Sequence, residues 1–312
     1  MAVTVVGSIA FDAVRTPFGE RERMLGGSAV HFSLAASFFS DVRVVGPVGE
    51  DFGEPELAVL EARGVDTEDI ERVAGGQTFF WRGHYDYDLN VAHTDETALN
   101  VFGEFQPKLS EPSRQADVVF LANIQPDLQR EVREQCTGAR LVALDSMNLW
   151  IQTARDSLVR TIAGVDCVLM NDAELRMLTE RANLLQAARR VMEWGPRIVV
   201  AKQGEYGAAL FSGDHFFALP AYPLETVLDP TGAGDSFAGG FLGYLAAHDL
   251  SEELEDDLLR RAMAYGTALA SFNVEEFGTE RVQRLTPDEV TERVAELQRF
   301  TTFVDAPVAL RG

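Results

Sequence analysis

The sequence is poor in cysteine and has no long apolar run. Its 312 residues include two cysteines, Cys136 and Cys167, without CxxC spacing. A disulfide framework is therefore excluded, and we expect two buried thiols. No apolar run reaches the ~18–20 residues that span a bilayer. The first residues lack the basic region and cleavage pattern of a signal peptide, which predicts a cytoplasmic protein.

Lysine and paired histidines are also scarce. Lys108 and Lys202 are the only lysines, and the five histidines show neither HxxxH nor HExxH spacing. This argues against a transition-metal site built from histidine. The formal net charge of −22 argues against nucleic acid and anionic membranes as partners, because both need a basic face. A saline habitat and genome composition explain the acid excess equally well, and the sequence does not separate them.

What the sequence does contain is an alternation of short β-branched runs and helical patterns. Such alternation predicts a parallel sheet covered by helices on both faces. The predicted strands are 3–9, 42–48, 117–123, 140–146, 166–172 and 197–203. The predicted helices are 27–40, 53–63, 126–137, 151–163, 172–178, 182–194, 236–248, 252–274 and 286–300.

Two stretches, 11–25 and 76–104, break this pattern. Aromatic and β-branched residues nearly alternate with polar ones in 76–104, which favours exposed antiparallel strands. Together the two stretches predict a small β-sheet flap, although a long surface hairpin fits the periodicity as well. The aromatic side chains of the second stretch could stack on a ligand, form the flap's own core, or contact a second copy. They are Phe79, Phe80, Trp81, Tyr85 and Tyr87.

The most informative stretch is "DPTGAGDSFAGGFLG" at 229–243. It reads as a glycine-rich turn feeding a helix N-terminus, where free backbone N–H groups favour an anion. Asp235 at this position is either a helix cap or a base that deprotonates an attacking hydroxyl. The stretch lacks the GxxxxGK[ST] of a P-loop. It also has Phe237 where a dinucleotide-binding GxGxxG has its last glycine, and it comes too late in the chain for an NAD-binding oxidoreductase.

The stretch resembles the C-terminal signature of the ribokinase-like (PfkB) carbohydrate and nucleoside kinases. Further stretches are similar to that family in the same order: "GSIAFD" (7–12), "GGSAVHFSLAA" (26–36), "NDAE" (171–174) and "KQGEYGA" (202–208). The resemblance covers roughly residues 3–280. It implies a single ribokinase-like three-layer α/β/α domain over 1–312, with a mostly parallel central sheet and a small β-sheet lid formed by about 11–25 and 76–104.

The resemblance also implies roles for individual residues. Asp235 would be the catalytic base, and Gly232, Ala233 and Gly234 would supply a backbone anion hole. Asp12, Gly26 and Gly27 would face the acceptor. Asn171 and Glu174 would act through water on Mg²⁺ bound to ATP, and Asn171 could also cap the helix that follows it. The resemblance further implies a monovalent cation such as K⁺ near Asp229 and Thr231.

Some positions depart from the family or match it loosely. His31 stands where the family commonly has an asparagine that contacts the sugar; it either contacts the acceptor or is packed under the flap. Lys202 stands where threonine is common, and either contacts a phosphate or is a solvated strand end. Gly204 and Gly207 would shape the turn beside the nucleotide. Thr231, Asn273 and Gly278 would lie near ATP, the last two in the adenine pocket.

The predicted activity is ATP-dependent transfer of the γ-phosphoryl group to a primary hydroxyl of a sugar or sugar-like polyol. A nucleoside acceptor remains open, because the aromatic residues favour a flat ligand while His31 argues against a standard ribosyl site. A catalytically silent ligand sensor on the same fold is the alternative of another class. The expected partners are small molecules, with a homodimer through the lid.

Overall fold

The structure, a computed structural model, describes residues 1–250 and 254–302. Within them a nine-stranded sheet has the order β13-β12-β11-β10-β9-β8-β1-β4-β5. The strands from β11 to β5 pair in parallel, and β12 and β13 add an antiparallel edge. The strands are β1 (Ala2–Val6), β4 (Asp41–Val48), β5 (Ile70–Arg72), β8 (Val118–Leu121), β9 (Leu141–Leu144), β10 (Cys167–Asn171), β11 (Ile198–Lys202), β12 (Ala208–Ser212) and β13 (His215–Leu219).

All six predicted strands are confirmed, with ends that differ from the prediction by up to three residues. The segment 224–230, which leads into the glycine-rich stretch, is a loop. The antiparallel edge was not predicted. It forms because the chain reverses at Gly204–Gly207, directly after β11, and Gly207 has the left-handed φ of 98° that this turn requires.

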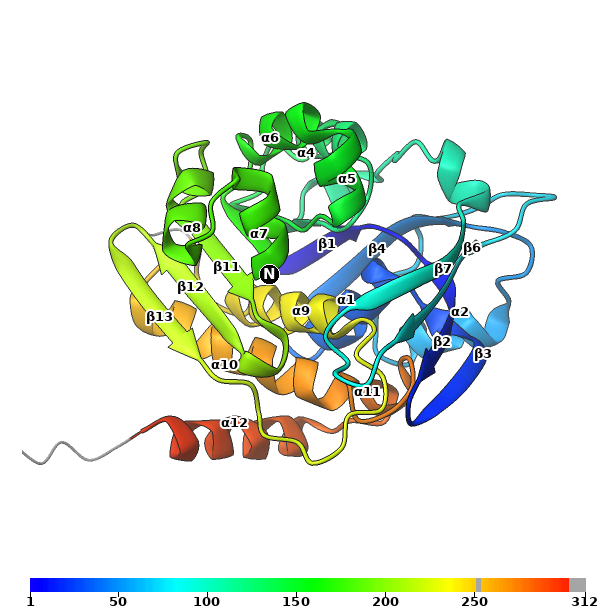
Figure 1. The fold of residues 1–312 in the computed structure, drawn as a ribbon. Coiled ribbons are helices and arrows are strands. Elements are labelled where there is room, and N and C mark those ends of the chain that lie inside the picture. The colour runs from blue at the N-terminus through cyan, green and yellow to red at the C-terminus, as the bar shows by residue number, and fades with distance from the viewer. Residues whose placement is uncertain (251–253, 303–312) are drawn as a thin grey trace, which may run out of the picture.

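Helices cover both faces of the large sheet (Figure 1). Side chains alternate along β8, so that Val118 and Phe120 enter one core while Val119 and Leu121 enter the other. One face carries α4 (Pro126–Gln135), α5 (Asn148–Thr153), α6 (Arg155–Ile162), α7 (Asp172–Thr179) and α8 (Leu184–Met192). The other carries α1 (Ser28–Ala36), α9 (Ala233–Ala246) and α10 (Asp256–Asn273).

The predicted helices are confirmed, with ends that differ by up to four residues and with two larger differences. The helix expected over 151–163 is two helices, because Ala154 leaves the helical conformation at φ −139°. The helix expected over 252–274 is α10, and residues 252 and 253 lie outside the described residues. The remaining helices are α2 (Glu54–Glu61), α3 (Glu111–Arg114), α11 (Glu280–Gln283), α12 (Pro287–Thr301) and the short 3-10 helices η1 (Asn100–Glu104) and η2 (Gly204–Tyr206).

The two exceptional stretches form a second sheet, which we call the small sheet. In the described residues its order is β3 (Gly19–Gly26), β2 (Ala10–Thr16), β6 (Phe79–Tyr85), β7 (Ala92–Ala98). The expectation of antiparallel strands is wrong for the central pair: β2 and β6 run parallel, because α1, β4 and α2 intervene between them in the chain. Asp12 pairs with Trp81, so Asp12, Trp81 and Tyr85 share one face.

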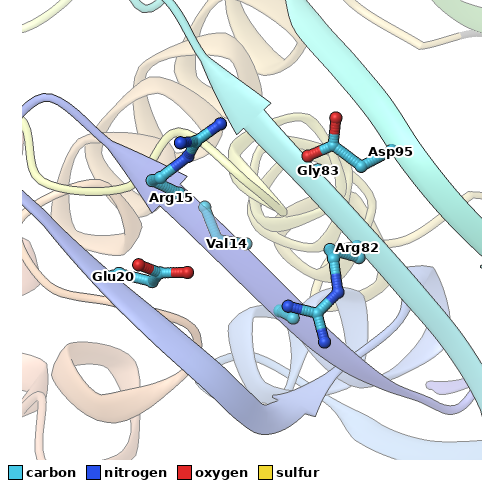
Figure 2. A pocket seen from close by; sticks show the side chains of 7 residues that line it. Val14, Arg15, Glu20, Arg82, Gly83 and Asp95 are labelled. Carbon is cyan, nitrogen blue, oxygen red and sulfur yellow. The ribbon is translucent and has the colours of Figure 1, made fainter.

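The opposite face of the small sheet carries charged side chains. Figure 2 shows Arg15, Glu20, Arg82 and Asp95 on this face, with helices of the main body behind the sheet. They line a cavity of about 310 Å³. The cavity therefore lies on the side of the sheet away from Asp12. A homodimer through the small sheet, the lid expected from the sequence, stays a prediction.

Within the same described ranges, no helix combines the length and apolarity needed to span a bilayer. Both cysteines are buried and free in this part of the chain.

Candidate active site

The glycine-rich stretch forms a tight turn and the first turn of α9. Gly232 is the N-cap and adopts φ 75°, a conformation that favours glycine. As a glycine, this N-cap residue has no side chain to cap the helix end. Asp235 lies three residues further on, so its interpretation as the cap residue is wrong. The first N–H groups of a helix have no intrahelical partner and point, with the positive end of the helix dipole, at any anion placed there.

The N–H groups of the turn are not equivalent. Ala233 donates to the carbonyl of Pro230 at 3.2 Å, a contact that an incoming anion would have to share. Gly232 precedes α9 and Gly234 lies in its first turn. The backbone N–H groups of these two residues therefore have no acceptor within the helix. A Cβ on Gly234 would lie 2.9 Å from Lys202 Nζ, which places the lysine ammonium directly beside the turn.

Lys202 belongs to a charged cluster at the carboxyl edge of the large sheet. It ends β11, Asn171 ends β10 beside it, and Asp145 follows β9. Lys202 Nζ lies 2.8 Å from Asp145 Oδ2, and the two side chains are 16% and 8% exposed. Burial lowers the pKa of Lys202, but the carboxylates of Asp145 and Glu174 outweigh it, so the pKa is raised overall. The lysine is therefore a held cation and not a solvated strand end.

Asn171 and Glu174 form a capping box at the start of α7. The Glu174 N–H donates to Asn171 Oδ1 at 2.7 Å, and the Asn171 N–H donates to Glu174 Oε2 at 2.9 Å. The capping function of Asn171 is thus confirmed. Glu174 is buried, and its other carboxylate oxygen lies outside the box.

The cluster carries more negative than positive charge. Burial, and then the charge of Asp145, raise the pKa of Asp235 to about 7 and that of Glu174 to about 8, although Lys202 opposes both shifts. Three carboxyl groups face one ammonium, and their oxygens suit a hard divalent cation. In the part of the chain that the structure describes, there is no group of three or more Asp, Glu, His or Cys side chains that could hold a metal ion directly.

Asp12, on β2 of the small sheet, lies against the start of α1. Its Oδ2 accepts from the Gly27 N–H at 3.4 Å, and a Cβ on Gly26 would come within 1.9 Å of that oxygen. Gly27 has φ 95°, so both glycines are needed for this approach. Burial, followed by the charge of Asp229, raises the pKa of Asp12 to about 7, and Asp235 contributes to the shift.

The small sheet is tied to the glycine-rich turn. The Tyr85 hydroxyl lies 3.2 Å from Thr231 Oγ1, and the Thr16 hydroxyl donates to the Leu228 carbonyl at 2.9 Å. Buried Asp229 accepts from the Thr231 and Gly278 N–H groups, at 2.9 Å each. The small sheet therefore lies over the turn, and Asp229 joins the turn to the segment after α10.

His31 and Asn273 lie together beneath the same turn. His31 is 2% exposed, and its Nδ1 is 2.9 Å from Asn273 Oδ1. Asn273 also donates to the Thr231 carbonyl at 2.7 Å. The structure thus brings Asn273 next to the turn, where the sequence placed it only in an adenine pocket.

Asp145 is the residue of this site that the sequence analysis did not single out. A signal was present, because Asp145 ends the buried run "RLVALD" and so comes at the carboxyl end of a parallel strand. The pairing with Lys202 could not be predicted from local pattern, since the two residues are 57 positions apart in the chain.

Comparison with known proteins agrees with this fold. The chain matches the pfkB family carbohydrate kinases over residues 3–284. It is 31% identical over 258 residues to a cytidine kinase of Thermococcus kodakarensis, covering 80% of this chain and 91% of that protein. It is 27% identical over 291 residues to a nucleoside kinase of Methanothermobacter thermautotrophicus, covering 88% and 90%.

Among solved structures, a nucleoside kinase of Methanocaldococcus jannaschii superposes with a TM-score of 0.75 at 21% identity, covering 95% of this chain and 98% of that one. The fold is therefore ribokinase-like. The chain belongs to the PfkB family of carbohydrate kinases. It is an ATP-dependent carbohydrate or nucleoside kinase, and its family implies a divalent metal with ATP.

Proposed function

We propose that this kinase transfers the γ-phosphoryl group of ATP to a primary hydroxyl of a nucleoside, with Asp235 as the base. The observation that carries the proposal is the convergence of Asp235, Lys202 and the start of α9 at one point. The ionised Asp235 takes the hydroxyl proton while the new oxygen–phosphorus bond forms and the bond from Pγ to the β,γ-bridging oxygen breaks. The Gly232–Gly234 N–H groups and Lys202 stabilise the charge on the transferred group and on the departing ADP.

The acceptor is held on the opposite side by Asp12. A carboxylate there accepts hydrogen bonds from sugar hydroxyls, and Gly26 and Gly27 leave room beside it. Trp81 shares the face of the small sheet with Asp12 and presents a flat apolar surface suited to a base. This surface, together with the cytidine and nucleoside kinases among the relatives, favours a nucleoside over a simple sugar.

The divalent cation is Mg²⁺ in this proposal. The Asn171–Glu174 pair would hold its water ligands, since Mg²⁺ keeps several waters, and the ion would supply charge neutralisation at the phosphates. Gly204 and Gly207 shape the turn beside Lys202, and Gly278 fixes Asp229 near the nucleotide. Asp229 and Thr231 remain the proposed place of a monovalent cation such as K⁺.

The raised pKa of Asp235 predicts how the rate depends on pH. Only the ionised form accepts a proton, and the pKa of about 7 means that ionisation is lost as pH falls through neutrality. We expect kcat/KM for the acceptor to fall about tenfold per pH unit below the pKa, and more steeply where Asp12 is protonated too. The profile is measured from pH 5 to pH 9 at saturating ATP. A profile that stays flat down to pH 5 contradicts the assignment.

A panel of acceptors tests the proposed function directly. ATP consumption with Mg²⁺ is measured against nucleosides, pentoses, hexoses and polyols, and the product is identified by mass. We expect kcat/KM for at least one nucleoside to exceed that for ribose by about 10-fold or more, because a base that stacks on an aromatic ring adds binding energy. Turnover of sugars alone would overturn the nucleoside assignment. No turnover of any acceptor would favour the silent sensor.

A further inference from the structure

His31 and Asn273 form a buried pair whose hydrogen-bond directions are fixed. Asn273 Nδ2 lies 2.7 Å from the Thr231 carbonyl oxygen, which only accepts, so the amide nitrogen must face it. Asn273 Oδ1 therefore faces the other way, where the Ser236 hydroxyl donates to it at 3.0 Å and His31 Nδ1 lies 2.9 Å away. His31 must then carry its proton on Nδ1.

This arrangement leaves the other ring nitrogen of His31 as an acceptor. His31 Nε2 is buried and has no hydrogen-bond partner among residues 1–250 and 254–302. Burial also lowers the pKa of His31 to about 4, so the ring is neutral at ordinary pH. A neutral ring with its proton on Nδ1 is a specific state that Asn273 imposes.

The ring of His31 also supports the turn by packing. A Cβ on Gly232 would lie 2.4 Å from His31 Cγ and Cε1, so the ring occupies the space where a side chain at Gly232 would be. The turn from Thr231 to Ser236 is thus held in two ways. The imidazole packs against Gly232, and the Asn273 amide binds both the Thr231 carbonyl and the Ser236 hydroxyl.

We propose that His31 and Asn273 are positioning residues for the anion hole. Through ring packing and the Asn273 amide they fix the backbone of Thr231–Gly234, so that its N–H groups face the transferred phosphoryl group. His31 acts on the phosphoryl side of the reaction and does not contact the acceptor. The inference rests on the proposed role of Gly232 and Gly234 as the anion hole.

The first test reads the state of the ring without turnover. Long-range ¹H–¹⁵N spectra of the wild-type protein resolve the tautomer of each histidine, and the signals that vanish in His31→Phe belong to His31. We expect a protonated Nδ1 and an unprotonated Nε2, unchanged from pH 8 down to about pH 5. A proton on Nε2, or titration near the ordinary value of 6.5, overturns the pair. This result does not depend on whether the proposed reaction is correct.

The second test separates positioning from binding. We expect His31→Phe and Asn273→Ala each to lower kcat about 10- to 100-fold, because small displacements of catalytic groups cost this much. The KM values for acceptor and ATP should stay within about twofold. The double variant should be no worse than Asn273→Ala, because phenylalanine keeps a ring packed against Gly232 and removes only the hydrogen bond to Asn273, which Asn273→Ala already removes. A raised acceptor KM with kcat retained, or multiplicative losses, overturns the proposal.

His248→Phe is the matched control. His248 also makes one Nδ1 hydrogen bond to a neighbour, the Tyr244 carbonyl, near the other end of α9. It should retain wild-type kcat and KM. The melting temperatures of all variants are measured beside their rates. If His31→Phe does not fold, single substitutions of the other four histidines assign the His31 signals by elimination.

Discussion

Asp235→Asn is expected to lower kcat by ~10²–10⁴-fold, the contribution of a positioned general base. Asparagine has nearly the same shape but cannot accept the hydroxyl proton, so the anion hole and Lys202 remain while the proton loses its acceptor. The measurement is steady-state turnover with the best acceptor of the panel, together with ATP affinity by calorimetry. ATP should bind about as tightly as to the wild-type protein. Turnover close to wild type would contradict the mechanism.

The same variant should be more stable than the wild-type protein above neutral pH. The pKa of Asp235 is raised in the fold from 3.8 to about 7. Between these values the folded state binds more protons than the unfolded state, so the group's contribution to stability is lost as pH rises. Asparagine has no such dependence. We expect Asp235→Asn to melt about 2–4 °C higher at pH 8 and to show no gain at pH 4.

Gly232→Ala is expected to lower kcat by about 10²–10³-fold, the cost of losing a donor of an anion hole. The added methyl group would lie 2.4 Å from the His31 ring, so the turn or α1 must shift. Alanine also disfavours the φ of 75° that Gly232 adopts. Rates and melting temperatures are measured together, because the variant is expected to lose activity by more than its stability change explains.

Gly64→Ala is the matched control for this substitution. Gly64 has nearly the same φ, 72°, but an added Cβ would meet nothing within 4 Å in the described residues. Gly64→Ala therefore measures only the loss of folding stability from placing alanine at this φ, roughly 1–2 kcal/mol. It should keep the wild-type kcat. Equal losses of kcat in the two variants would show that strain, and not displacement of the anion hole, is responsible.

The strands, the helices and the glycine-rich turn could be predicted because each depends on local pattern. Buried β-branched runs specify strands, and "GAGDSF" specifies a turn into a helix by its glycines alone. The parallel pairing of β2 with β6 could not be predicted in the same way, because 62 residues separate Thr16 from Phe79 and local alternation says nothing about which strand lies alongside.

The contacts that set the pKa values in the site could not be predicted for a similar reason. Asp235 and Lys202 were chosen from their motifs, but their pKa values depend on Asp145, which reaches them only when β9 and β11 flank β10 in the sheet. His31 is the clearest case. Its identity raised the alternatives of acceptor contact and packing, and the choice between them depends on Asn273, which is 242 residues away.

The buried ion pair of Lys202 gives the protein an internal spectroscopic label. Lys202 and Lys108 are the only lysines in the chain, and Lys108 is exposed while the Lys202 side chain is 16% exposed. Lysine-selective isotope labelling therefore labels two side-chain ammonium groups, one on the surface and one beside the glycine-rich turn. If ATP binds beside Lys202 as proposed, the Lys202 resonance should shift on nucleotide binding, with Lys108 as the reference in the same spectrum.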